Sequence, residues 1–332
     1  MNKNKPIKIV IIALLLLSLM TSCNYNQEYN EVFYDYKSFN VNYDLSEYDL
    51  QKINYELAMN TNKEEALDYL IDLAFANQEI LENYSIISTG QGEVQAGSLG
   101  YVNMQIFSIF IDNDNNWYFQ NVIKSYASKP EFLLKMLQSK LDLSLRQYVT
   151  DSTVLMQTSN KKNIFLDEEF TCMNCNFEEV PLITEDINNI YSYKEHYNKI
   201  SGFVINSETV LADDIEINYN ENELTYTINC SVNLVDENIK DNATKDNRDM
   251  LRETGDLPSL EYNSIMISLE IWNNGTIKQY EIQEKWSADF SLLGTSFIIS
   301  SNYDFTHKYS YAPEDSNYEE MYIDLSWTEQ NN

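Results

Sequence analysis

Glycine, histidine and basic residues are scarce in this chain of 332 residues, which has 8 glycines and 2 histidines. So few glycines argue against a nucleotide site built on a glycine-rich phosphate loop. Aspartate and glutamate number 52 against 22 lysines and arginines, which gives a formal net charge of −30. Proteins that bind nucleic acid neutralise phosphates with basic side chains, so this charge argues against a nucleic-acid partner.

Signatures of catalytic or metal sites are also lacking. The sequence has no GxSxG or HExxH pattern, which are the marks of common hydrolases and metalloproteases. His307 lies in an alternating aromatic run without the Ser, Cys or acid pattern of a triad, and we interpret it as a hydrogen-bonded core residue. The run 112–116 begins like a calcium loop but fails at the sixth and twelfth positions, Trp117 and Ile123. We therefore expect no enzyme, no metal ion and no non-covalent cofactor.

The amino terminus has the three-part pattern of a secretory signal peptide. Basic residues at Lys3, Lys5 and Lys8 precede an apolar run from Ile9 to Met20, and small residues follow. A membrane-spanning helix needs roughly 20 apolar residues, and this run is shorter. The pattern favours an export signal over a transmembrane span.

The end of this segment resembles the lipobox of bacterial prolipoproteins. In Leu19-Met20-Thr21-Ser22-Cys23 a cysteine follows two small residues, and Met20 replaces the leucine usually found three places before it. The resemblance implies that residues 1–22 are a removable signal peptide and that Cys23 carries two or three acyl chains. Two chains are enough for stable anchoring. We expect a protein anchored to a cell membrane or outer membrane and facing outside the cytoplasm; a plain secreted protein is the alternative.

Three cysteines follow Cys23, and they leave several interpretations open. Cys172 and Cys175 form a CxxC motif between acidic flanks that do not read as a helix start. A short disulfide or two thiols at a turn is favoured over a redox pair, which needs a lowered thiol pKa, and over zinc, which needs four ligands. Cys230 falls on the apolar face of a predicted strand, where it acts as a small hydrophobic residue.

The mature chain divides into a tether, a domain and a tail. Residues 23–60 are acidic and rich in Tyr and Asn, residues 61–312 form a single domain, and residues 313–332 form an acidic tail. A capping box at 61–64 begins a helix that continues to Leu81, and Ser128-Lys129-Pro130-Glu131 begins another that continues to Leu141. Weaker helical patterns cover residues 184–199 and 236–254.

Alternating apolar residues predict several strands. The predicted ranges are 101–111, 117–126, 224–234, 265–271, 276–286 and 297–311. After Pro313 we expect a loosely held acidic end, with a short strand around Ile323, Leu325 and Trp327 as the alternative. Strands joined by tight turns are antiparallel, and a sheet with one wet face needs a cover on the other. The sequence therefore predicts an α+β fold: a long, twisted, half-barrel-like antiparallel sheet with helices on one face.

The order of these elements from Thr61 to Tyr311 resembles the LolA/LppX-type half-barrel lipoproteins. The stretch MLRETGDLPSL, then SIMISLEIWNNGTIKQYEIQEKW, and the aromatic strand after it carry the resemblance. It implies a role in binding or carrying a lipid or other apolar ligand, with Tyr303, Phe305 and Tyr309 lining the cavity. An ordinary core is the alternative for this stripe. The alternative function is a surface-interaction or envelope-structure lipoprotein whose acidic exterior meets a protein partner that the sequence does not identify.

Overall fold

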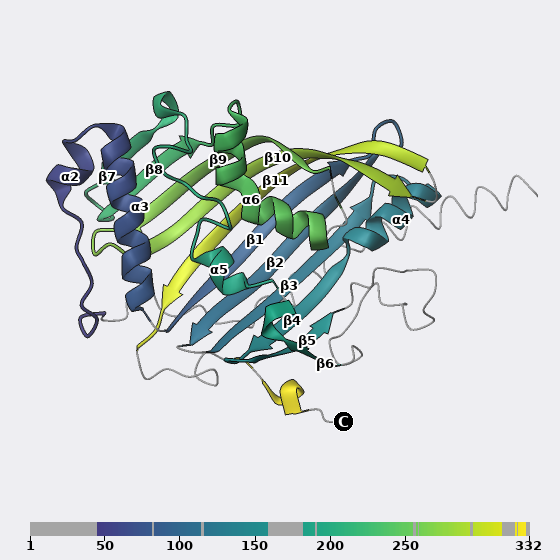
Figure 1. The fold of residues 1–332 in the computed structure, drawn as a ribbon, viewed down its shortest axis with the longest axis horizontal. Helices are drawn as coiled ribbons and strands as arrows, with labels where there is room; N and C mark the ends of the chain where they lie inside the picture. The colour runs from purple at the N-terminus through teal and green to yellow at the C-terminus, as the bar shows by residue number, and fades with distance from the viewer. Residues whose placement is uncertain are drawn as a thin grey trace, which may run out of the picture.

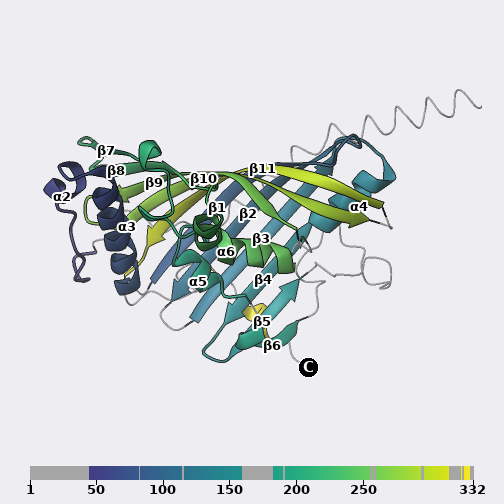
Figure 2. The same ribbon diagram turned by 45° about the horizontal axis from the view of Figure 1, so that its top comes forward.

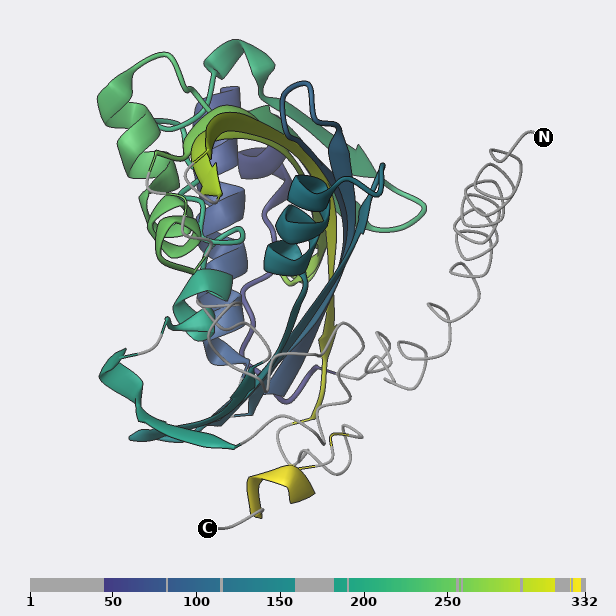
Figure 3. The ribbon, with the colours of Figure 1, turned by 90° about the vertical axis from the view of Figure 1, so that its right-hand side faces the viewer.

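One antiparallel sheet of 11 strands dominates the computed structural model. The model describes residues 45–81, 83–113, 116–158, 182–189, 191–254, 257, 259–292, 295–313, 323 and 325–329. The strand order is β6-β5-β4-β3-β2-β1-β11-β10-β9-β8-β7, and the sheet is not closed. Figure 3 shows that it curves around the helices, which gather on its concave side. The predicted α+β class with a half-barrel-like sheet is confirmed.

The described elements follow one another in two meanders. The strands are β1 (Asn83–Gln95), β2 (Tyr101–Asn113), β3 (Asn116–Ala127), β4 (Leu143–Val149), β5 (Thr153–Thr158), β6 (Ile183–Asp186), β7 (Glu216–Asn220), β8 (Thr225–Ser231), β9 (Glu261–Trp272), β10 (Ile277–Leu292) and β11 (Thr295–Tyr311). The helices are α2 (Tyr55–Met59), α3 (Lys63–Ile80), α4 (Phe132–Leu141), α5 (Tyr193–Tyr197) and α6 (Glu237–Thr254), with short 3₁₀ turns at Ile187–Asn189, Ala212–Asp214 and Ser326–Glu329.

The pairing of β1 with β11 joins the two meanders at the centre of the sheet. These strands come from opposite ends of the domain, and their register runs from Tyr84 opposite Tyr311 to Gln95 opposite Ser300. Figures 1 and 2 show α3 and α6 across the strands on the same face. The concave face therefore holds the main core, to which residues of α3 such as Leu67, Leu70 and Ala74 contribute.

A second, smaller apolar cluster lies on the opposite face of the sheet. Phe107, Ile109 and Tyr118 alternate along β2 and β3 with residues of the main core, so they point the other way. Ile323 and Trp327 from the carboxyl end of the chain cover them. The alternative of a short strand at this end is wrong, because Ser326–Glu329 form a 3₁₀ turn.

The two strongest helix predictions are right, but the capping residues differ. The cap of α3 is Asn62, whose side chain accepts a hydrogen bond from the Glu65 amide at 2.9 Å, whereas the Thr61 hydroxyl donates to the Leu57 carbonyl. The α4 helix begins at Phe132, and the Ser128 hydroxyl accepts from the Tyr101 amide instead of capping it. The Thr61 hydroxyl therefore bonds to the preceding helix α2, and the Ser128 hydroxyl bonds to the first residue of β2.

The predicted helix at 184–199 is mostly wrong. Its first residues form β6, in which Thr184 lies opposite Leu155 of β5. Among the described residues of this range, only Tyr193–Tyr197 are α-helical. Pairing with a distant strand decided the conformation here, since a short apolar pattern fits a helix or an edge strand equally well.

The predicted tether extends too far into the chain. Ile53 and Ala58 are buried, at 8% and 2% exposure. The Gln51 amide donates to the side-chain oxygen of Asn77 on α3 at 2.8 Å, and the Ile53 amide donates to the carbonyl of Asn273 at the β9–β10 turn. Residues 45–60 therefore belong to the folded domain, whose boundary precedes the predicted residue 61.

Candidate functional site

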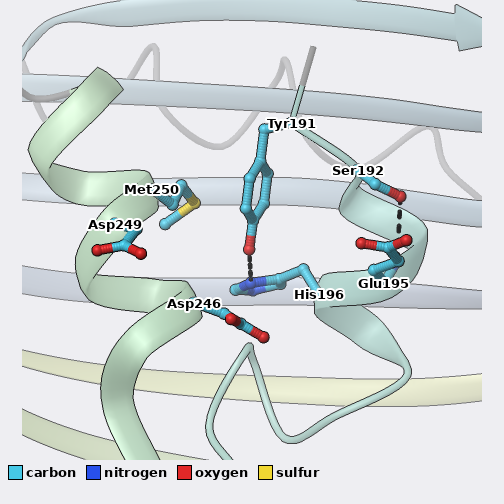
Figure 4. Close-up of a pocket in the computed structure, with 7 residues that line it drawn as sticks. All are labelled: Tyr191, Ser192, Glu195, His196, Asp246, Asp249 and Met250. Atoms are coloured by element: carbon cyan, nitrogen blue, oxygen red, sulfur yellow. Dashed lines mark hydrogen bonds between the residues drawn. The ribbon is translucent and has the colours of Figure 1, made fainter. Parts of the chain in front are cut away.

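A pocket of about 240 Å³ lies between α5 and α6. Figure 4 shows the two helices on either side of it, with strands of the sheet behind. Tyr191 and residues of α5 supply one wall, and one face of α6 supplies the other. The lining residues are Tyr191, Ser192, Glu195, His196, Asp246, Asp249 and Met250.

The short helix α5 positions His196 beside Tyr191. Ser192 caps this helix, because its hydroxyl accepts a hydrogen bond from the Glu195 amide at 3.2 Å. The Tyr191 hydroxyl lies 3.0 Å from Nδ1 of His196. Burial lowers the pKa of His196 to about 4, with Asp246 opposing the shift, and burial raises the pKa of Tyr191. Both side chains are therefore uncharged at neutral pH.

The acidic wall of the pocket belongs to α6. Its first turn is capped by Asp236, whose carboxylate accepts from the Asn238 amide at 2.9 Å. Asp246 pairs with Lys199, and Asp249 pairs with Lys245 at 2.6 Å. Neither lysine is among the lining residues. The pocket lining thus carries carboxylates and no cationic side chain.

A buried carboxyl lies on the concave face of the sheet. Glu284 is 6% exposed, and its register partner on β11 is Tyr303. Burial raises the pKa of Glu284 to about 8. Neither the Trp286 N–H nor the hydroxyl of Tyr262, which lies opposite Trp286 on β9, has a hydrogen-bond partner in the described part of the chain. A buried carboxyl beside unpartnered donors is costly to folding and is typical of functional sites.

His307 lies at the centre of a buried hydrogen-bonded chain. Its Nδ1 is 2.7 Å from the Ser88 hydroxyl and its Nε2 is 3.1 Å from the Ser201 hydroxyl. The Ser201 hydroxyl is also 3.1 Å from that of Tyr280. Burial lowers the pKa of His307 to about 3, so the ring is neutral. The prediction of a hydrogen-bonded core histidine is confirmed.

The three predicted ligand-lining residues lie on one face of β11, within or against the main core. Tyr303 and Tyr309 are buried, at 7% and 2% exposure, and Phe305 is partly buried. Tyr303 and Phe305 lie opposite Gly92 and Gly90 of β1. A Cβ at Gly92 would come within 2.2 Å of the Tyr303 ring, so glycine is needed for this close approach. None of the three lines the pocket between α5 and α6, and their contact with a ligand stays a prediction.

Of the four cysteines, Cys230 alone falls in the described residues. It is buried on β8 with a free thiol, and burial raises its pKa to about 12. The interpretation of Cys230 as a small hydrophobic residue is confirmed. Cys23, Cys172 and Cys175 lie outside the described residues, so the acylation and the alternatives for the CxxC motif stay predictions.

The sequence patterns do not reveal the pocket residues, but they do contain a signal for Glu284. Tyr191 and His196 come from a segment with only a weak helical pattern, and only packing against α6 brings them to Asp246 and Asp249. Glu284 is different, because it occupies an apolar position between Ile282 and Trp286 in an alternating strand. A carboxylate on the buried face of a strand is a sign of function that sequence reading can find.

Comparison with known proteins adds no functional assignment. No protein-family model and no curated protein matches the chain. Among solved structures, the chain is similar to Neisserial surface protein A at 5% identity over 70% of this chain and 97% of that one, with a TM-score of 0.21. An AttH candidate from Nitrosomonas europaea matches at 8% identity over 71% of this chain and 54% of that one, with a TM-score of 0.17. Such low scores carry no argument about function. None of the helices in the described ranges has the length and apolar character needed to cross a bilayer.

Proposed function

We propose that this protein is a lipid-anchored, extracytoplasmic binding protein that takes a small apolar or amphiphilic ligand. The observation that carries the binding role is the pocket between α5 and α6, which combines the Tyr191 ring and the Met250 thioether with convergent polar groups. Small-ligand sites combine aromatic and apolar walls with a few placed polar groups, and this pocket offers both. The anchor is supported by the signal pattern and by Cys23 at its end.

The anchor depends on a single sulfur atom. We expect Cys23→Ala to abolish acylation and processing, because the thiol is the group that accepts the lipid in the resembled family. Detergent phase partition and intact-mass measurement check this: the wild type should enter the detergent phase with acyl mass attached. Cys230→Ala is the control and should be acylated normally. A Cys23→Ala protein that still carries acyl mass would show that the lipobox interpretation is wrong.

Ligand binding is tested by native mass spectrometry of the mature lipoprotein after addition of octylammonium, octanoate or octan-1-ol. We expect at least one of these to form a one-to-one complex. Met250→Trp should weaken that complex, because the indole fills the pocket, whereas Asn242→Trp places the same ring on an exposed position of α6 and should not. If none of the three compounds binds, or if both variants bind like the wild type, the proposed pocket is not the ligand site.

A further inference from the structure

Exposed apolar side chains gather at one end of the sheet. Phe132, Ile298 and Tyr101 are 65%, 66% and 39% exposed. They belong to the beginnings of α4, β11 and β2. Figure 1 shows α4 at the right-hand end of the sheet, beside the ends of β10 and β11. We call the surface around these three side chains the α4 end.

Contacts of α4 join the two sides of this surface. The Lys129 ammonium, just before the helix, donates to the Leu99 carbonyl of the β1–β2 turn at 3.4 Å. In the last turn of the helix, the Lys140 ammonium lies 5.3 Å from the centre of the Phe290 ring on β10. Phe290 lies opposite Phe297 of β11, next to Ile298. The α4 helix therefore contacts both the β1–β2 turn and the β10–β11 hairpin.

The α4 end also concentrates basic charge on an acidic protein. Residues 124–140 contain four lysines and one glutamate, in a chain with a formal net charge of −30. Lys129, Lys135 and Lys140 form no ion pair in the described part of the chain, whereas the lysines of α5 and α6 are paired with carboxylates. The neighbouring exposed acids are Glu131 and Asp289. Lysines therefore outnumber carboxylates around the exposed apolar side chains.

We propose that the α4 end docks on the surface of an anionic lipid bilayer, with Phe132 and Ile298 in the interface and the lysines beside the phosphate head groups. Apolar side chains among lysines are typical of surfaces that lie on a membrane. Each lysine is attracted to an anionic surface within about a Debye length, which is about 8 Å at physiological ionic strength. Acidic groups farther away therefore add little repulsion. Separate apolar side chains suit a fluid bilayer better than a protein partner, which requires shape complementarity.

This inference goes beyond the proposed function and does not require the acyl anchor, but the two are compatible. The described chain begins near the other end of β11, because the Tyr48 hydroxyl donates to the Ala312 carbonyl at 3.3 Å. The chain from Cys23 to Leu45 can span up to about 75 Å. The 17 residues of β11 span roughly 55 Å. An acyl chain on Cys23 and the α4 end can therefore enter the same bilayer.

Vesicle flotation of an anchor-free chain tests the inference. Both apolar clusters of the described chain lie at or after Leu45, so a chain that begins at Asn24 keeps them. It should float with vesicles of phosphatidylglycerol and phosphatidylcholine in equal parts, and bind pure phosphatidylcholine vesicles about tenfold or more weakly. Raising the salt concentration from about 0.1 M to about 1 M should release it, because the Debye length falls from about 10 Å to about 3 Å. A chain that does not bind the anionic vesicles, or binds both kinds equally, overturns the inference.

A charge-matched pair of variants locates the basic contribution. Lys129→Gln/Lys135→Gln should weaken binding to the anionic vesicles about tenfold. Lys52→Gln/Lys63→Gln removes the same charge from exposed positions before α2 and at the start of α3, which lie at the opposite end of the sheet (Figure 1). This control should bind like the wild type. Equal losses in the two double variants would mean that net charge, and not the α4 end, controls binding, and the inference would be wrong.

A second pair of variants locates the apolar contribution. Phe132→Ser/Ile298→Thr should weaken binding about tenfold, because less apolar surface enters the bilayer. Leu57→Ser/Leu224→Ser changes two exposed leucines, on α2 and just before β8, and should bind like the wild type. All of these positions are exposed, so thermal unfolding should be close to that of the wild type. Unchanged binding of Phe132→Ser/Ile298→Thr would overturn the proposed contact with the bilayer.

Discussion

Gly275→Ala is expected to destabilise the protein by about 2–5 kcal/mol, the sum of a backbone contribution of about 1–2 kcal/mol and a packing contribution of about 1–3 kcal/mol. Gly275 lies in the β9–β10 turn at a φ of +83°, a conformation that L-residues adopt at a cost of about 1–2 kcal/mol. A Cβ there would lie 2.3 Å from the Asn77 side-chain nitrogen and 2.5 Å from both the Gln51 carbonyl and the Leu73 side chain. Two of these neighbours are tied together, because Asn77 donates to the Gln51 carbonyl at 2.8 Å. They have little room to move.

Gly97→Ala is the matched control for this turn. Gly97 also has a positive φ, of +53°, but a Cβ there would have no atom within 4 Å. It should therefore lose only the backbone contribution, about 1–2 kcal/mol. Urea unfolding of both variants at constant pH gives the comparison. Equal losses would mean that packing of the segment 45–60 and α3 against the turn contributes nothing, contrary to the structure.

This turn illustrates what the sequence predicts and what it does not. Asn273-Asn274-Gly275 between alternating runs predicts the hairpin correctly, because glycine is the residue type that most readily adopts the positive φ of such a turn. The same sequence does not predict that Gln51 and Asn77 close over the turn. Those contacts join residues far apart in the chain, and no local period signals them.

The central strand β1 is missing from the sequence prediction for a physical reason. Its concave-face positions include Ser88, Gly90 and Gly92, which carry little apolar signal. They are small because they face His307, Phe305 and Tyr303 of β11. The aromatic run of β11 is therefore predicted, whereas the strand that accommodates its rings is not. The pocket is missed for a related reason, since its walls meet only after α5 and α6 pack on the sheet.

Glu284→Gln is expected to stabilise the protein at neutral and alkaline pH. Folding raises the pKa of this carboxyl from 4.5 to about 8, so the folded state binds a proton that the unfolded state has released. Stability from this group is greatest below pH 4.5 and is lost as the pH rises towards 8. A tenfold change in the acid dissociation constant corresponds to about 1.4 kcal/mol, and pH 7 lies 2.5 units above the unfolded pKa of 4.5, so removing the ionisable group should gain about 3 kcal/mol at pH 7.

The two buried histidines add a loss of stability on the acid side, so the wild type should have a stability maximum at a defined pH. Folding lowers the pKa values of His196 and His307 from 6.5 to about 4 and about 3, so their stabilising contributions are present above pH 6.5 and fall as the pH decreases below it. Below pH 6.5 the rise in stability with pH from the two histidines exceeds the fall from the one glutamate. Between pH 6.5 and 8, Glu284 alone of these three groups changes the stability, which falls as the pH rises. Urea unfolding across pH 5–9 should therefore show maximal wild-type stability near pH 6.5.

Glu284→Gln should remove the alkaline decline and keep the acid one, whereas Glu281→Gln, on the exposed face of β10, should leave the profile unchanged. An alkaline decline that persists in Glu284→Gln would show that a group other than Glu284 causes it, contrary to the raised pKa of this carboxyl.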